Sequence, residues 1–368
     1  MKIVIFGLSI SSSWGNGHAT LWRGLCNALI NRGHSIVFFE RDVPYYAGIH
    51  RDFTELNGGE LVLYPDWPGT VASAKRHLSD ADVGLVTSYC PDAIPAADLI
   101  LSSRAPLRVF YDLDTPITLS RLQAGEQVAY IDPVRGLSDF DLVLSYTGGQ
   151  ALSELRTRLG AKLVAPLYGS VDPNVHRPAA AVDEFRADIS YLGTYAEDRQ
   201  ETLENLFIAT ARQMPNRRFL IGGAQYPQDF PWTNNIFFVR HIPPDMHASF
   251  YCSSPVTLNV TRRAMAAMGY CPSGRLFEAA ACGVAIATDA WEGLNHFYEP
   301  GEEILVCRTS DDVVDAMNMP PDRLARIALA ARRRTLDSHT ADHRATELEA
   351  ILSSAYSRCR DTVLAVER

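Results

Sequence analysis

Short apolar runs alternate with helix-like segments along almost the whole chain, beginning at its second residue. Runs of this kind are typical of parallel strands that are buried on both faces, with helices as the connections between them. We therefore predict an α/β fold. In the first half of the chain, the expected strands are residues 2–7, 35–40, 60–64, 83–88, 107–112 and 142–146, with a helix at 19–31.

A second series of apolar runs follows a proline-rich stretch at 166–178, which is the best candidate for a linker. Its expected strands are residues 189–193, 219–222, 236–240, 256–260, 284–288 and 304–307. The chain has 368 residues, which is long for a single core. We predict two Rossmann-like domains, 1–170 and 171–340, followed by a charged C-terminal helix at 341–368.

Composition excludes several classes of protein. The formal net charge is −9, whereas nucleic-acid binders usually need a basic face. No apolar run approaches the ~20 residues of a membrane span. A strand that begins at Lys2 leaves no room for a signal peptide, and the seven cysteines are scattered without a C-x-x-C pair. We expect a cytoplasmic protein with free thiols and no structural zinc.

The stretch 273–289 predicts a short helix that leads into a buried strand. Ser273 is a suitable N-cap, and Gly283 is suited to the left-handed turn after the helix. Arg275 lies in the first turn of this helix, where an anion is favoured, and Glu278 lies one turn further on the same face. A carboxylate can accept hydrogen bonds from two hydroxyls. The pattern therefore indicates a nucleoside diphosphate with its ribose, although an i,i+3 surface ion pair would give the same spacing.

The sequence Arg-Leu-Phe-Glu-Ala-Ala-Ala-Cys-Gly at 275–283 resembles the donor-binding run of GT-B glycosyltransferases, in particular the CgeB-like group of spore-maturation proteins. The loop that follows contains Trp291, Glu292 and Gly293, which the resemblance assigns to the donor site. It also implies a GT-B fold, with two Rossmann-like domains facing across a cleft and a C-terminal helix that packs on the first. GT-B members generally need no metal, so we expect no cofactor beyond a nucleotide-sugar co-substrate such as a UDP or dTDP sugar.

Further donor-binding residues follow the predicted strand at 256–260. Asn259 and Arg262 belong to an L-N-x-x-R pattern that resembles the same relatives, and Arg263 comes next. A guanidinium group at this position would neutralise the diphosphate leaving group as its charge develops.

The first predicted strand ends in a long loop of small residues that opens the first helix. Ser13, Trp14, Gly15, Asn16 and Gly17 are expected near the donor phosphate or the acceptor, since ligands bind at the carboxyl ends of parallel strands. The loop lacks the third glycine of the dinucleotide-binding fingerprint, which argues against a nicotinamide enzyme.

His18, directly after this loop, is the candidate general base. It occupies the position where many inverting GT-B enzymes carry theirs, and imidazole titrates near neutral pH. A packing role in the loop is the alternative. A carboxylate that orients the histidine would come from Asp112 or Asp114, which share a face if the fifth strand extends that far. Their D-x-D spacing could also indicate a metal site, which the GT-B resemblance disfavours.

Tyr45, Tyr46 and Trp67 are candidate acceptor-binding residues, because aromatic rings with polar edges follow predicted strands here. Packing beneath loops is their alternative role. Retaining GT-B enzymes often carry an E-x7-E pattern, but Cys271 stands seven residues before Glu278. This difference favours inversion.

These observations predict a hexosyltransferase-type glycosyltransferase that moves a sugar to a hydroxyl- or amine-bearing acceptor, either a small molecule or a surface group. A nucleotide-sugar epimerase of the same fold and a non-catalytic nucleotide-sugar-binding protein are the alternatives. The sequence leaves the sugar, the acceptor and the oligomeric state open.

Overall fold

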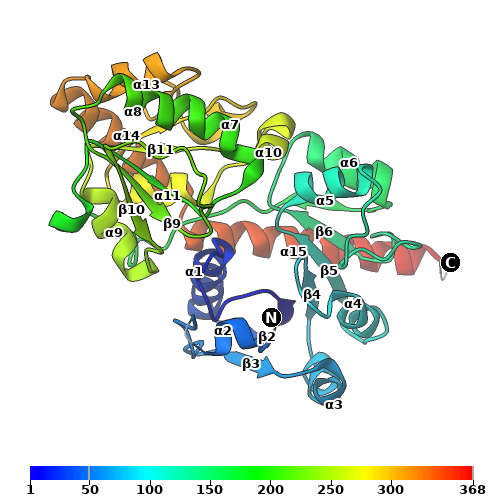
Figure 1. Cartoon of the computed structure of the whole chain (residues 1–368). Helices are drawn as coiled ribbons and strands as arrows, with labels where there is room; N and C mark the ends of the chain where they lie inside the picture. Colours follow the sequence, from blue (N-terminus) through cyan, green and yellow to red (C-terminus); the bar gives the residue numbers. More distant parts are fainter. Residues whose placement is uncertain (49, 367–368) are drawn as a thin grey trace. The chain divides into compact units, whose positions relative to one another are not determined.

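The computed structural model describes residues 1–48 and 50–366, so residues 367–368 of the predicted C-terminal helix lie outside it. The chain forms two compact units (Figure 1). The first comprises residues 1–13, 18–168 and 341 to the C-terminal end, and the second comprises 14–17 and 169–340. Among the described residues, no helix combines the length and apolarity needed to cross a bilayer.

The first unit is built on a parallel seven-stranded sheet of order β3-β2-β1-β4-β5-β6-β7. Chain order reverses between β1 and β4, which creates the switch point where ligands bind in such sheets. The strands are β1 (Lys2–Gly7), β2 (Ser35–Arg41), β3 (Glu60–Tyr64), β4 (Val83–Thr87), β5 (Leu107–Asp112), β6 (Leu142–Ser145) and β7 (Val164–Pro166).

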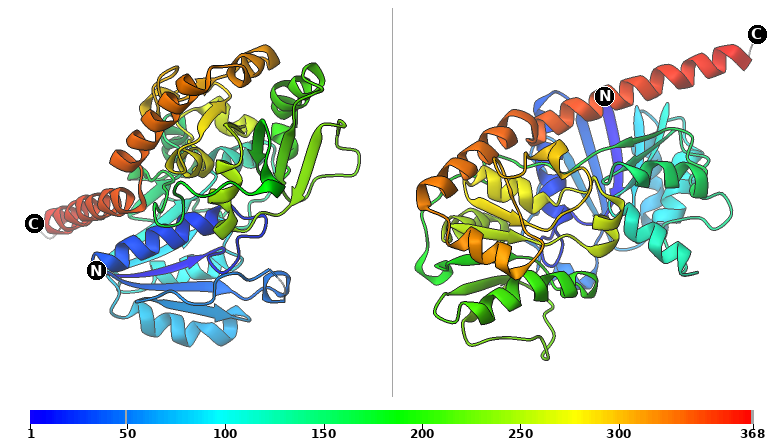
Figure 2. Two further views of the ribbon diagram at one scale, coloured as in Figure 1. Left: turned by 90° about the vertical axis from the view of Figure 1, so that its left-hand side faces the viewer. Right: turned by 90° about the horizontal axis from the view of Figure 1, so that it is seen from above.

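Helices cover both faces of this sheet, because the central strands are apolar on both sides. One face packs on α1 (His18–Asn31) and α15 (Ala341–Val366), through residues such as Leu25 and Leu348. The long C-terminal helix can be followed beside this sheet in Figure 2. The remaining helices of the unit are α2 (Pro44–Ala47), α3 (Trp67–Leu78), α4 (Ala93–Leu101), α5 (Thr115–Gln123) and α6 (Gln150–Leu159).

The second unit contains a parallel six-stranded sheet of order β10-β9-β8-β11-β12-β13, with its switch point between β8 and β11. Its strands are β8 (Ile189–Leu192), β9 (Phe219–Gly223), β10 (Ile236–Arg240), β11 (Val256–Asn259), β12 (Ala285–Thr288) and β13 (Leu305–Val306). Its helices are α7 (Gln200–Leu203), α8 (Ala209–Gln213), α9 (Pro244–Cys252), α10 (Arg263–Met268), α11 (Gly274–Ala281), α12 (Leu294–Phe297), α13 (Ser310–Met317) and α14 (Pro321–Ser338).

A π-helical segment, Glu204–Ile208, joins α7 to α8 in one continuous helical run, and 3-10 turns occupy Asp183–Phe185 and Glu197–Arg199. All twelve expected strands are present, most within one residue of their predicted ends. The thirteenth, β7, was not predicted because its three residues include a proline, which is uncommon inside strands. The α/β fold with two parallel, Rossmann-like sheets is confirmed.

Candidate active site

The loop after β1 is held by one buried carboxylate at the carboxyl end of β2. Glu40 accepts hydrogen bonds from the hydroxyls of Ser9 and Ser11 and from the amides of Ile10 and Ser11, at 2.6–2.9 Å. Four donors compensate the cost of burying this carboxylate, which is only 1% exposed. The sequence did not reveal this role, because nothing local connects Glu40 to residues thirty positions earlier.

A second carboxylate fixes the end of the same segment. Asp52 accepts hydrogen bonds from the amide and hydroxyl of Ser13, and Arg23 contacts it at 2.6 Å. Burial raises the pKa of Asp52, but the bonds from Arg23 and Ser13 outweigh it and leave the pKa below its usual value. The backbone that leads toward α1 is therefore anchored on both sides.

His18 is the first residue of α1, and its imidazole faces a carboxylate from the opposite side of the switch point. Its Nε2 lies 3.7 Å from Oδ2 of Asp114, and the two side chains are 26% and 12% exposed. The hydroxyl of Tyr89 donates to the same oxygen at 2.9 Å. Tyr89 has a φ of +64°, a conformation that costs a non-glycine residue energy and is concentrated at functional sites.

Asp112 is the last residue of β5, so the strand does not extend to Asp114, and the shared strand face expected for the two aspartates does not form. Asp112 is fully buried, and its Oδ1 accepts from the amide of Asp114 at 3.2 Å and from Thr118 at 3.1 Å. Burial raises the pKa of Asp112 to about 6. The two aspartates therefore have different surroundings. Asp114 faces His18, and Asp112 supports the turn that carries Asp114.

The three aromatic residues expected to bind the acceptor differ in their surroundings. Tyr45 is 53% exposed and packs edge-on against Tyr46, with ring centroids 5.3 Å apart. Trp67 begins α3 and packs edge-on against Phe6 and Tyr64. Trp67 therefore contributes to packing, while Tyr45 leaves a ring at the surface; their acceptor roles stay predictions.

In the second unit, α11 begins and ends where the sequence predicted, but its start is built differently. Ser273 occupies the N-cap position, yet its hydroxyl accepts from Nε of Arg275 at 3.1 Å and makes no capping hydrogen bond to the helix. Ser273 as the N-cap residue is therefore confirmed, but its expected capping hydrogen bond does not form, because Nε of Arg275 donates to the hydroxyl. Gly283 adopts the predicted left-handed conformation, with a φ of +77°.

Arg275 reaches over the carboxyl ends of β8 and β11. It donates to the carbonyls of Leu192 at 2.7 Å and Val260 at 3.2 Å. This path passes Gly193, where an added Cβ would lie 2.8 Å from the guanidinium group. Arg275 therefore ties together the loops after two strands at the switch point.

Arg199 is a residue that sequence analysis missed. Its Nη1 donates to the hydroxyl of Tyr191 at 3.2 Å, while its Nε has no hydrogen-bond partner in the described chain. Burial tends to lower the pKa of Arg199, but the neighbouring Tyr191 raises it above its usual value. Two guanidinium groups, from Arg199 and Arg275, thus meet at the ring of Tyr191.

Two further predicted arginines pair with carboxylates of the helical run after β8. Arg262 donates through Nε to Asp198 at 2.8 Å and is partly buried. Arg263 lies 3.6 Å from Glu201, and both side chains are mostly exposed, so this pair adds little stability. The carboxyl edge of the second sheet therefore gathers arginines from three separate segments.

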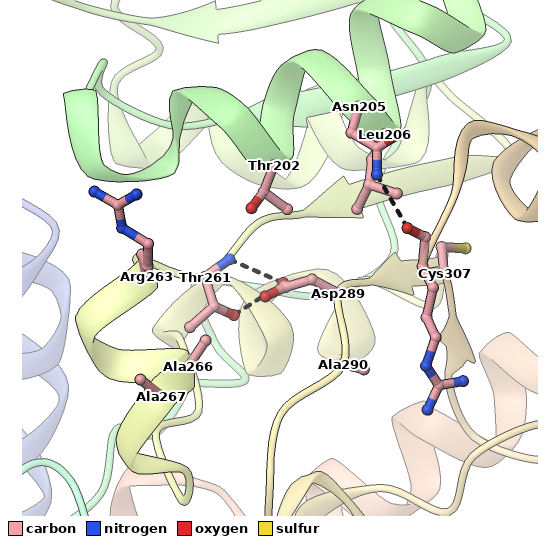
Figure 3. Close-up of a pocket in the computed structure, with 11 residues that line it drawn as sticks. Thr202, Asn205, Leu206, Thr261, Arg263, Ala266, Ala267, Asp289, Ala290 and Cys307 are labelled. Atoms are coloured by element: carbon pink, nitrogen blue, oxygen red, sulfur yellow. Dashed lines mark hydrogen bonds between the residues drawn. The ribbon is translucent and has the colours of Figure 1, made fainter.

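A pocket of about 410 Å³ lies at the carboxyl ends of β11, β12 and β13 (Figure 3). Asp289 lines the pocket and accepts hydrogen bonds from the amide and hydroxyl of Thr261 at 2.9 and 3.0 Å. Asn259 donates to Thr288 at 3.1 Å, and its side-chain oxygen has no hydrogen-bond partner among the described residues. The pocket is lined by Thr202, Asn205, Leu206, Thr261, Arg263, Ala266, Ala267, Asp289, Ala290, Cys307 and Arg308.

The loop after β12 packs against the segment between α10 and α11. The amide of Tyr270 donates to the carbonyl of Glu292 at 2.7 Å, and a Cβ at Gly293 would lie 2.6 Å from the Tyr270 ring. Trp291 is buried, and its indole nitrogen has no hydrogen-bond partner within residues 1–48 and 50–366. Within residues 14–17, the Trp14 ring lies 4.3 Å from that of His241, centroid to centroid.

Glu278 points into the second unit beside two histidines. Its carboxylate is 8% exposed, and Oε2 accepts from the hydroxyl of Tyr251 at 3.4 Å. His176 and His247 face its two oxygens at 3.9 and 3.8 Å. Burial lowers the pKa of His247 to about 4, so its ring is neutral near pH 7. No sequence pattern connects these histidines to Glu278, because they lie on separate segments.

Comparisons with known proteins agree on the fold. A family model described as "Glycosyl transferase-like" matches residues 199–350. No curated protein sequence matches the chain. Sucrose-phosphate synthase from Thermosynechococcus elongatus aligns over 97% of this chain and 100% of its own, with a TM-score of 0.69 and 15% identity.

Two further structures were solved with ligands. HepE from Anabaena, in complex with UDP and glucose, aligns over 96% of this chain and 100% of its own, with a TM-score of 0.69 and 15% identity. An alpha-glucosyltransferase in complex with UDP and a 13-mer DNA aligns over 96% and 99%, with a TM-score of 0.68 and 12% identity. These likenesses establish that the chain has the GT-B fold predicted from its sequence. The comparisons do not test the narrower resemblance to the CgeB-like group.

Proposed function

We propose that the protein is a metal-independent, inverting glycosyltransferase that moves a sugar from a nucleoside diphosphate to a hydroxyl or amine of a small-molecule or surface acceptor. The observation that carries the proposal is the His18–Asp114 pair at the switch point of the first sheet, 3.7 Å apart. The glycosyltransferase-like match over 199–350 and the UDP-bound structural neighbours support the donor class. A cytoplasmic location belongs to the proposal and is supported by seven cysteines that form no disulfide.

In the proposed reaction, the acceptor oxygen attacks the anomeric carbon and forms the new glycosidic bond. The bond between that carbon and the diphosphate oxygen breaks, and the nucleoside diphosphate leaves with the electron pair. The acceptor proton passes to His18. Asp114 faces Nε2 of His18, so it would hold that nitrogen protonated and leave Nδ1 to accept the proton.

The leaving diphosphate needs positive charge where its own charge grows. Arg275, Arg262 and Arg199 supply guanidinium groups at the carboxyl edge of the second sheet, and we propose that they take the place a metal ion holds elsewhere. Glu278 would accept the ribose hydroxyls. Transfer should therefore continue in the presence of a chelator.

The test of the catalytic pair is a set of single substitutions assayed with UDP and dTDP sugars and a neutral alcohol acceptor. His18→Ala and Asp114→Asn should each lower kcat, with the histidine variant losing about 10²–10⁴-fold. Donor binding, measured by calorimetry, should remain, because the proposed donor residues lie in the second unit. An acceptor that is already ionised should partly escape the defect.

Two tyrosines provide a matched control. Tyr89→Phe removes the hydroxyl that donates to Asp114, whereas Tyr298→Phe removes a buried hydroxyl of the second unit that contacts Thr335. We expect a loss of kcat for the first and little for the second. Full turnover by His18→Ala with a neutral alcohol would reject the proposal, and a retained anomeric configuration in the product would replace inversion with retention. Turnover of the donor without an acceptor would favour an epimerase, and binding without turnover would favour a binding protein.

A further inference from the structure

Three side chains with metal-binding atoms meet inside the second unit. They come from distant segments: His176 from the turn after Asp172, His247 from α9 and Glu278 from α11. Nε2 of His176 lies 3.4 Å from Nδ1 of His247. The carboxylate oxygens of Glu278 lie 3.9 Å from the first nitrogen and 3.8 Å from the second.

These separations match those of ligands around one ion. Zinc binds imidazole nitrogen and carboxylate oxygen at about 2.0–2.2 Å, so two ligands of a tetrahedral centre lie about 3.3–3.5 Å apart. The two histidine nitrogens already have this spacing. Each carboxylate oxygen lies about half an ångström beyond it from the nitrogen that it faces. The three ligand atoms, one from each residue, lie within 4.8 Å of one another, so the carboxylate would turn slightly to reach an ion. Both distances from Glu278 to the imidazole nitrogens are too long for a hydrogen bond, so direct bonding between these pairs does not account for the convergence.

The groups behind the cluster favour metal binding. Nε2 of His247 lies 3.0 Å from the carbonyl of Ile242, and a carbonyl only accepts, so this nitrogen carries the proton. Nδ1 of His247 is then unprotonated, and its lone pair is directed toward His176 and Glu278. A histidine that binds a metal usually donates a hydrogen bond from its other ring nitrogen, as His247 does here. The hydroxyl of Tyr251 likewise donates a hydrogen bond to Oε2 of Glu278.

His176 is only 3% exposed, and its Nδ1 has no hydrogen-bond partner in the described chain. No contact therefore fixes its tautomer from outside the cluster. Its Nε2 can donate to His247 when no ion is present and can present a lone pair when one is. The cluster can thus switch between the two states by moving a proton on one ring.

We propose that His176, His247 and Glu278 form a binding site for a first-row transition metal ion, of which Zn²⁺ and Co²⁺ are the probes. Two imidazoles and one carboxylate suit these ions better than Mg²⁺ or Ca²⁺, which prefer oxygen ligands. Three protein ligands leave a fourth position for water. This metal site goes beyond the proposed transfer reaction, and the transfer reaction itself needs no metal ion. Glu278 belongs both to the metal site and to the proposed donor site, so a bound ion would compete with a ribose for its carboxylate.

The experiment is a titration of the full-length protein with Co²⁺ after treatment with a chelator and its removal. We expect one equivalent to bind with the visible absorption of low-coordinate Co²⁺, and Zn²⁺ to displace it. His176→Gln and His247→Gln should each weaken binding by more than the ~10–100-fold typical of lost outer-sphere partners. His339→Gln is the matched control, because His339 is also a buried histidine of this unit but lies outside the cluster.

Tyr251→Phe provides a variant that keeps all three ligands, and we expect it to lower the affinity for Co²⁺ by about tenfold or more. Circular dichroism would confirm that each variant is folded. Absence of a saturable one-equivalent site in the wild-type protein, or equal binding by both cluster histidine variants and the control, would overturn the proposal. UDP binding by the two cluster histidine variants separates this test from the proposed function, since only the metal should be lost.

Discussion

The buried His247 ring should make the second unit less stable in mild acid. Its pKa is lowered from 6.5 to about 4, mainly by burial. Glu278 opposes this shift, while His176 and His241 add to it. The unfolded chain therefore takes up a proton near pH 6.5, and the folded chain does so only near pH 4.

The sign and size of the effect follow from this difference. Stability from the neutral ring is fully present above pH 6.5 and is lost as the pH falls toward 4. Integrating proton binding between pH 7 and 5 gives a loss of about 2 kcal/mol, and about 3 kcal/mol by pH 4. His247→Gln removes the titrating ring. The free energy of unfolding of this variant should therefore fall less than that of the wild type between pH 7 and the lower pH, by the same amounts.

The assay is hydrogen exchange of amides in α9 and α11, corrected for the intrinsic exchange rate and performed on the full-length chain with a chelator present. Parallel curves for the wild type and His247→Gln between pH 7 and 5 would refute the reasoning, because the ring would then be protonated equally in both states.

Other predictions concern the packing of α15 and the glycines of the second unit. Glu349 accepts from Arg32 at 2.7 Å and lies 2.6 Å from His34, and these contacts lower its pKa to about 2. Glu349→Gln should therefore lower the free energy of unfolding at pH 7 by up to about 1 kcal/mol, with the difference fading as the pH falls from 4.5 toward 2; urea denaturation would measure it. Gly223→Ala should cost more than the ~1–3 kcal/mol of ordinary overpacking, because its Cβ would lie 2.0 Å from the carbonyl oxygen of Gly193. Gly283→Ala should cost only about 1–2 kcal/mol, since its φ is +77° but its added Cβ would make only ordinary van der Waals contacts, at 3.6 Å with Arg332 and 3.9 Å with Pro178; equal melting temperatures for the two variants would contradict this comparison.

The sequence by itself determined where the strands lie along the chain. Apolar runs such as 107–112 and 256–260 are local signals, since burial on both faces requires apolar side chains at successive positions. The left-handed turn at Gly283 was equally local, because backbone conformation there depends on the absence of a side chain. The helix expected at 19–31 was also a local signal, and α1 begins one residue earlier, at His18.

Only the tertiary structure decided which side chains meet. It placed Asp114 rather than Asp112 beside His18, because β5 ends at Asp112 and the turn that follows redirects the next residues. It turned Arg275 toward the carbonyls of Leu192 and Val260 and its Nε toward Ser273, which therefore forms no capping hydrogen bond.

The convergence of His176, His247 and Glu278 lies beyond any sequence pattern, since about seventy residues separate the first two and thirty the last two. Periodicity reports which face of its own element a residue occupies, and it carries no information about the element packed opposite. Contacts between distant segments depend on how whole elements pack, and in this chain those contacts define both the proposed catalytic pair and the proposed metal site.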